Sequence, residues 1–114
     1  MKEFYVYILA SDKNGTLYVG MSSNLEQRIY QHKNKLIDGF TKQYNVDNLV
    51  YFELCDGPDS ATQRERQIKE WRRSWKVELI EDNNPNWNDL SAELFDWIPN
   101  QVRDDAASGE SVQL

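Results

Sequence analysis

The sequence predicts a small domain that mixes helix and strand (α/β, of the α+β kind), and three observations support this prediction. Residues 4–10 and 16–21 are aromatic and β-branched runs joined by an Asn-Gly turn, which is a typical hairpin signal. A third such run covers residues 49–54. Two segments with apolar residues at helical spacing begin near Asn24 and Ser60.

The composition is that of one folded domain. The 114 residues can enclose a single modest core. With 39% hydrophobic and 28% charged residues, the composition fits neither a disordered nor a membrane protein. No apolar run approaches the roughly 18 residues of a membrane helix. We therefore expect no membrane partner. The single cysteine, Cys55, excludes an intramolecular disulfide, so we expect a cytoplasmic protein.

The negative charge is concentrated at the C-terminal end. The net charge is −6, but residues 1–80 hold 12 Lys/Arg and 11 Asp/Glu, whereas residues 81–114 hold one Arg and 8 Asp/Glu. A nucleic-acid partner is therefore not excluded, because phosphate contacts depend on local basic patches. We predict one domain over residues 1–90. An acidic extension follows over residues 91–114 and is predicted to be disordered from about residue 99.

The hairpin relates its tyrosines by parity. Side chains alternate across a strand, and directly paired residues share a face. A loop with an even number of residues therefore puts Tyr7 and Tyr18 on the same face, whereas an odd loop separates them. The sequence leaves the register open. Taken alone, Tyr5, Tyr7 and Tyr18 are more often core residues than catalytic ones.

The first helix is predicted to begin near Asn24, because Ser23 and Glu26 have the spacing of a capping box. The polar residues 39–48 after it predict a loop. The predicted apolar stripe of this helix consists of Leu25, Ile29, His32 and Leu36.

The second helix is predicted to start near Ser60, with Gln63 completing a capping box, and to run to about Leu79. A break near Arg73 is left open. Its two tryptophans fit the apolar stripe, so we expect them in the core. The stripe consists of Ala61, Ile68, Trp71, Trp75 and Leu79.

Arg28 and His32 are four residues apart and are therefore neighbours on one helix face. A lone histidine there is usually a hydrogen-bonded core residue. An arginine facing the sheet needs a carboxylate or a bound phosphate, because burying an unpaired guanidinium is costly. Glu65 is the best internal candidate for that carboxylate. It also fits two other interpretations: a solvated helix surface with ion pairs, or a ligand for a hard divalent cation.

A stripe of basic residues lies along the second predicted helix. Residues 64–76 contain six Lys/Arg side chains and two glutamates, interleaved with two tryptophans. This pattern is typical of a phosphate-binding surface with stacking partners. The residues expected to contact nucleic acid are Arg64, Arg66, Lys69, Arg72 and Arg73.

Together these segments resemble the GIY-YIG nuclease family, in particular small single-domain members related to the nuclease domain of the excinuclease C subunit. Tyr5-Val6-Tyr7 stands at the first family motif and Tyr18-Val19-Gly20 at the second. Residues 24–28 resemble the segment that ends in the family's arginine, and His32 stands where members have His or Tyr. Residues 65–69 resemble the segment that supplies the metal-binding glutamate. The likeness covers roughly residues 4–90.

Two features depart from the family pattern. Tyr5 replaces the glycine of the first motif. The family's late asparagine matches either Asn88 or Asn86, and the sequence leaves this choice open. We expect no separate DNA-binding domain like that of many members, so the resemblance says little about target specificity.

The resemblance implies a three-stranded antiparallel sheet flanked by helices and a divalent-metal-dependent endonuclease. It implies that Glu65 holds Mg²⁺ or Mn²⁺. The expected substrate is nucleic acid, DNA rather than RNA, in repair, recombination or processing. The residues implied in catalysis are Tyr7, Tyr18, Arg28, His32 and Glu65.

Two alternatives remain at this point. The first is a nucleic-acid-binding module without turnover. The second is a protein-interaction domain that uses Trp87, Phe95 and Trp97 together with the acidic tail.

Overall fold

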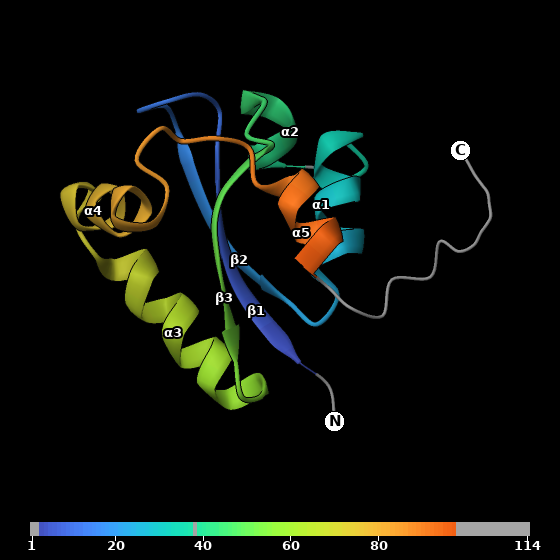
Figure 1. Ribbon diagram of the computed structural model, residues 1–114, viewed down its shortest axis with the longest axis vertical. Helices are drawn as coiled ribbons and strands as arrows, with labels where there is room; N and C mark the ends of the chain where they lie inside the picture. Colours follow the sequence, from blue (N-terminus) through green and yellow to red (C-terminus); the bar gives the residue numbers. More distant parts are fainter. Residues whose placement is uncertain (1–2, 38, 98–114) are drawn as a thin grey trace.

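The structure, a computed structural model that describes residues 3–37 and 39–97, has a three-stranded antiparallel sheet with helices on both faces (Figure 1). The strands are β1 (Phe4–Ala10), β2 (Leu17–Ser22) and β3 (Asn48–Cys55). Their order is β2-β1-β3, so the first strand is central. The predicted α+β class and three-stranded sheet are confirmed. Among the residues described, no helix is long and apolar enough to cross a membrane.

The central strand is buried on both faces, which explains why neither of its alternating faces is polar. Its even-numbered residues, such as Ile8, pack with α3 (Pro58–Glu70) and α4 (Arg73–Asn83). Its odd-numbered residues face α1 (Leu25–Lys33) and α5 (Ser91–Trp97) on the opposite side (Figure 1). The sheet therefore separates two hydrophobic clusters, and Tyr7 belongs to the α1 side.

The β1–β2 turn has an even number of residues. Ser11 N donates to Thr16 O at 3.0 Å, which encloses four residues, and Asn14 adopts a left-handed conformation with φ 59°. Tyr7 pairs with Gly20 and Leu9 pairs with Tyr18. Tyr7 and Tyr18 therefore share a face, as the even-loop prediction requires.

The region after β2 differs from the prediction in three respects. The N-cap of α1 is Asn24, whose Oδ1 accepts from Gln27 N at 3.1 Å, rather than Ser23. The helix ends at Lys33, so Leu36 lies outside it and is 64% exposed. The predicted loop contains a short helix, α2 (Phe40–Tyr44), which is too short to leave a periodic pattern.

The break near Arg73 that the sequence left open is present, and two helices occupy the stretch over which one helix could have run. The chain is extended at Trp71 and Arg72, so α3 ends at Glu70 and α4 begins at Arg73. In Figure 1, α3 is seen from its side and α4 nearly end-on, which shows the change of direction. Pro58 is the first residue of α3, two residues before the predicted start. Trp75, predicted to be core, is 48% exposed.

The cap of α3 also differs from the prediction. Ser60 Oγ accepts a hydrogen bond from Gly57 N at 3.2 Å, so Ser60 acts at the third helical position and not as the N-cap paired with Gln63. This arrangement satisfies an N–H group at the helix start.

The C-terminal part of the described chain packs back onto the sheet. Asn84 ends α4, and Trp87 is buried against the α3 side. Leu94 of α5 is fully buried in the cluster on the α1 side. The side chains of Phe95 and Trp97, and the predicted tail from residue 99, lie outside what the structure describes.

Candidate active site

The two phenols meet on the α1 face of the sheet. Tyr7 is fully buried, Tyr18 is half-buried, and their ring centroids are 6.3 Å apart. Tyr7 lies across the backbone of Gly20, its partner on β2. A Cβ atom at Gly20 would come within 2.7 Å of both Cζ and the hydroxyl of Tyr7. Glycine at this position is therefore what allows the Tyr7 ring to occupy its place.

His32 projects from α1 and completes a buried hydrogen-bonded chain. Tyr7 Oη lies 3.1 Å from His32 Nε2, and His32 Nδ1 lies 3.0 Å from Thr41 Oγ1. Burial, followed by the charge of Arg28, lowers the pKa of His32 to about 4. The imidazole is therefore neutral near pH 7, with one nitrogen donating and the other accepting.

Three further ring contacts link these groups and Phe40 into one aromatic cluster. The His32 ring lies 5.9 Å from Tyr7 and 5.6 Å from Tyr18, centroid to centroid. Tyr18 in turn stacks on Phe40 at 6.5 Å. We refer to Tyr7, Tyr18 and His32 as the phenol site.

Charges from two helices act on the Tyr7 phenol. Burial raises the pKa of Tyr7 above its ordinary value, and the neighbouring Tyr18 and the charge of Glu65 raise it further. The positive charge of Arg28 opposes them. Arg28 on α1 and Glu65 on α3 are thus both close enough to affect the same hydroxyl. The structure therefore brings Tyr7, Tyr18 and His32 into ring contact, with Arg28 and Glu65 near enough for their charges to act on Tyr7.

The predicted pairing of Arg28 with Glu65 is not formed. Glu65 Oε2 lies 3.1 Å from Lys69 Nζ, one helical turn along α3. In the part of the chain that is described, no carboxylate forms a salt bridge with Arg28. Arg28 acts on the Tyr7 hydroxyl by its charge and by a hydrogen bond, and its remaining N–H donors can bind an anion such as a phosphate.

The residues present fit a divalent cation that is held jointly with substrate. Residues 3–37 and 39–97 contain no group of three or more His, Cys, Asp or Glu side chains that could hold a metal. Both nitrogens of His32 already have partners. Glu65 remains as the carboxylate near the phenols, with a side chain 18% exposed. One carboxylate, with substrate oxygens and waters, suits Mg²⁺ or Mn²⁺.

Arg64 of the predicted basic stripe has an internal role. Its Nε donates to Glu53 Oε2 at 2.9 Å, and the Tyr51 hydroxyl donates to the same carboxylate. Its guanidinium also lies over the Trp71 ring, 5.3 Å from the centroid. These contacts tie α3 to β3, so Arg64 has little freedom to turn toward nucleic acid.

The other stripe residues are only partly free. Lys69 pairs with Glu65, and Arg73 Nη2 donates to Gly15 O at 2.8 Å. Arg72 stacks over Trp75 at 5.0 Å, and Arg66 is exposed on α3. The stripe therefore fixes α3 and α4 as well as presenting charge to solvent.

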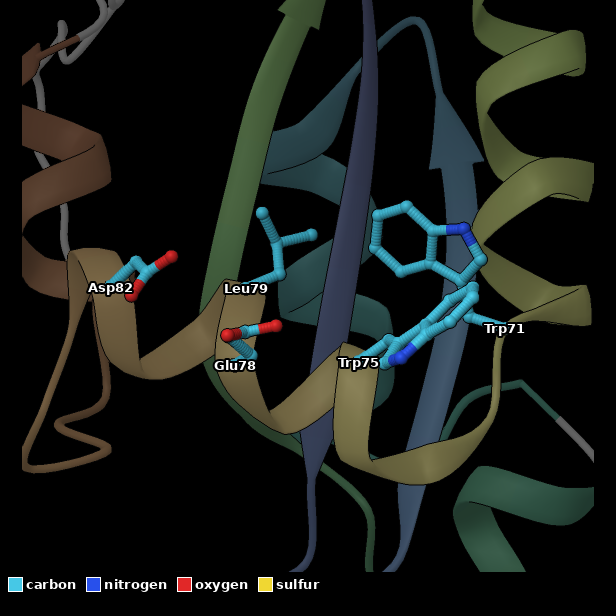
Figure 2. A pocket seen from close by; sticks show the side chains of 5 residues that line it. All are labelled: Trp71, Trp75, Glu78, Leu79 and Asp82. Carbon is cyan, nitrogen blue, oxygen red and sulfur yellow. The ribbon is translucent and has the colours of Figure 1, made fainter.

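A second aromatic region lies on α4 and the end of α3 (Figure 2). We call it the tryptophan cavity. It has a volume of about 380 Å³, and carboxylates as well as indole rings line it. Negative charge at this position disfavours a phosphate. The lining residues are Trp71, Trp75, Glu78, Leu79 and Asp82.

Sequence reasoning missed two residues. Thr41 holds His32 Nδ1 but lies in the stretch predicted as a loop, where only the packing of α2 brings it to the histidine. Asn84 is buried, and its side-chain amide donates to Val50 O at 3.1 Å. Asn86 and Asn88 are both exposed. Asn84 precedes Pro85, and this Asn-Pro pair, which is typical of a helix end, could have drawn attention to Asn84 in the sequence.

Comparisons with known proteins match this chain to one family model and to several proteins named UPF0213. The family model described as the GIY-YIG catalytic domain matches residues 3–78. A UPF0213 protein from Syntrophus aciditrophicus is 40% identical over 85 residues, covering 73% of this chain and 95% of that protein. A UPF0213 protein from Staphylococcus saprophyticus is 37% identical over 82 residues, covering 72% and 99%. The solution NMR structure of a UPF0213 protein from Bacillus halodurans is similar with a TM-score of 0.49 and 24% identity, covering 76% and 92%.

Proposed function

This chain belongs to the GIY-YIG catalytic-domain family, a family of nucleases, and we propose that it is a divalent-metal-dependent endonuclease. The observation that supports the proposal is that His32 lies in hydrogen-bond contact with the buried Tyr7 hydroxyl, while the charges of Arg28 and Glu65 both act on that hydroxyl. We place its substrate among nucleic acids, DNA in preference to RNA, with a role in repair, recombination or processing.

Phosphodiester hydrolysis needs positive charge around the reacting phosphate, because the phosphate repels nucleophiles and the alkoxide is a poor leaving group. We assign this role first to Arg28, whose fork of N–H donors matches phosphate oxygens. Mg²⁺ or Mn²⁺ held by Glu65 would add charge neutralisation at the attacking and leaving oxygens.

The two phenols differ in exposure, and this difference supports different roles. Tyr18 is half-buried and can meet a water molecule, so we assign it to the attacking water. Tyr7 is fully buried and its raised pKa keeps it protonated. A protonated Tyr7 donates to the neutral His32 Nε2, which leaves the phenol oxygen's lone pairs for a second donor. Tyr7 and His32 then act as positioning residues.

The test is cleavage of plasmid, single-stranded and branched DNA and of RNA, each with Mg²⁺, Mn²⁺ or EDTA. We expect products only with metal, and a loss of at least about 100-fold in Glu65→Ala. Glu70→Ala, at an exposed position on the same helix, is the matched control and should keep full activity. Cleavage that persists in EDTA or in Glu65→Ala contradicts the proposal.

The Glu65–Lys69 ion pair favours one second candidate, a nucleic-acid-binding module without turnover, because an ion pair can satisfy the carboxylate without a metal. Salt-sensitive binding of nucleic acid, with no product from any substrate, would support that candidate.

A further inference from the structure

Helix α2 presents two aromatic rings to solvent. Phe40 is 46% exposed and Tyr44 is 50% exposed, and they lie four residues apart on one face of the helix. Their ring centroids are 5.0 Å apart. Folding gains little from large rings left half in water, so a contiguous pair of them indicates a binding surface.

The exposed rings continue the phenol site. Phe40 stacks on Tyr18 with an interplanar angle of 26°, and Tyr18 contacts the His32 ring. A row of rings therefore leads from the buried hydroxyl of Tyr7 to the surface of α2. A substrate whose phosphate reaches Tyr18 lies next to this row, because Phe40 contacts the Tyr18 ring.

The inner side of α2 is fixed to the same site. Thr41, between the two exposed rings in sequence, is 6% exposed and bonds His32 Nδ1 at 3.0 Å. Val46 is fully buried after the helix, and its N donates to Thr41 O at 2.9 Å. These contacts hold the outer rings in a defined position relative to His32, which lowers the entropic cost of using them for binding.

We propose that Phe40 and Tyr44 form a stacking platform for unpaired bases next to the scissile phosphate. Nucleobases stack on aromatic side chains, and this stacking tolerates any sequence. In a duplex each base is already stacked and paired, so its face is covered. The platform therefore selects a substrate class, namely nucleic acid with unpaired nucleotides at the cleavage point, such as a single strand, gap or flap.

This inference rests on the proposed function, but its test does not require cleavage. Fluorescence anisotropy in EDTA at low salt would compare a labelled 12-nucleotide single strand with its blunt duplex. We expect wild type to prefer the single strand. Phe40→Ala and Tyr44→Ala should each weaken single-strand binding by about tenfold and leave duplex binding within about twofold. Phe40→Tyr, which keeps a ring, should bind like wild type.

Trp75→Ala is the matched control, because Trp75 is also an exposed aromatic residue (48%) but lies in the tryptophan cavity. It should leave both affinities unchanged. Removing single bases from the oligonucleotide gives a second readout. An abasic position that weakens wild type should have no effect in Phe40→Ala if the missing base had stacked on that ring.

The outcomes are distinct. Equal single-strand affinities for wild type, Phe40→Ala and Tyr44→Ala overturn the platform, and so does an equal loss for duplex. If these results occur while metal-dependent cleavage depends on Glu65, the proposed function stands without the platform. If no nucleic acid binds at low salt, both proposals fail and the exposed rings belong to a protein interface.

Discussion

The phenol site and the tryptophan cavity both combine aromatic rings with nearby arginine, yet they are built in opposite ways. In the phenol site the Tyr7 hydroxyl and the His32 ring nitrogens are buried, and they form a hydrogen-bonded chain that ends at Thr41 outside the site. In the tryptophan cavity Arg72 stacks over Trp75, whose ring is exposed. Buried polar chains are costly unless every member is satisfied, so they indicate a functional site better than composition does.

The two regions also differ in charge, and this difference again favours the phenol site as the place where a phosphate binds. In the phenol site Arg28 has no carboxylate in salt-bridge contact within the described chain, and this favours an incoming phosphate. In the tryptophan cavity Glu78 and Asp82 line the hollow. The tryptophan cavity is therefore the worse candidate for a nuclease site, and substitutions in the two regions should have unequal effects.

The largest expected difference is in catalysis. Arg28→Ala should lower the single-turnover cleavage rate by about 10²- to 10³-fold, because it removes positive charge at the phosphate. Arg72→Ala, in the second region, should change the rate by less than about threefold. Comparable losses in the two variants would contradict the distinction between the regions.

The buried imidazole predicts a pH effect on stability. The pKa of His32 is about 4 in the folded protein and 6.5 ordinarily, so the unfolded chain binds the proton more tightly. Its contribution to stability is complete above pH 6.5 and decreases as pH falls toward 4, by about 3 kcal/mol.

Urea unfolding at pH 7.5 and pH 4 would measure this effect in wild type and in His32→Gln. The variant should lose about 3 kcal/mol less between the two pH values than wild type does. An identical pH dependence in the two proteins would show that His32 does not titrate as a buried group.

Gly20→Ala should destabilise the fold and disturb the phenol site together. The new Cβ meets the Tyr7 ring at 2.7 Å, so strand or ring must shift, at a cost of about 1–3 kcal/mol. Gly57→Ala is the control, because nothing lies within 4 Å of a Cβ there. Denaturant unfolding and cleavage would be measured for both. Equal behaviour of the two variants would mean that the ring does not depend on Gly20.

The smallest effect is expected in the tryptophan cavity. Trp75→Ala should lower the free energy of unfolding by about 1 kcal/mol or less, because the side chain is 48% exposed. The cleavage rate should stay within about twofold of wild type. A large loss of cleavage in thermally stable Trp75→Ala would place substrate in the cavity.

The local parts of this structure could be predicted from sequence. Alternating side chains and an even turn were sufficient to put Tyr7 and Tyr18 on one face, since both follow from covalent geometry and hydrogen-bond parity. Helical spacing was sufficient to put Arg28 beside His32. The Asn-Gly turn lies where the sequence predicted it, between the first two strands.

The rest depends on tertiary contacts that no local pattern reports. Helix α2 has only five residues, so the sequence pattern does not predict it. The hydrogen bond of Thr41 with His32 could therefore be identified only in the folded structure. The break at Trp71 and the exposure of Trp75 arise because α4 turns away from α3. Glu65 pairs with Lys69 on its own helix and not with Arg28, because the pairing depends on side-chain geometry.

The most direct test of the account is the metal dependence of cleavage in Glu65→Gln, which removes one negative charge and keeps the shape of the side chain. Wild type and Glu70→Gln should cleave with a rate that rises with Mg²⁺ and saturates. Glu65→Gln should show no Mg²⁺-dependent rate over the same range, while still binding nucleic acid. Equal Mg²⁺ titrations for Glu65→Gln and wild type would contradict the account.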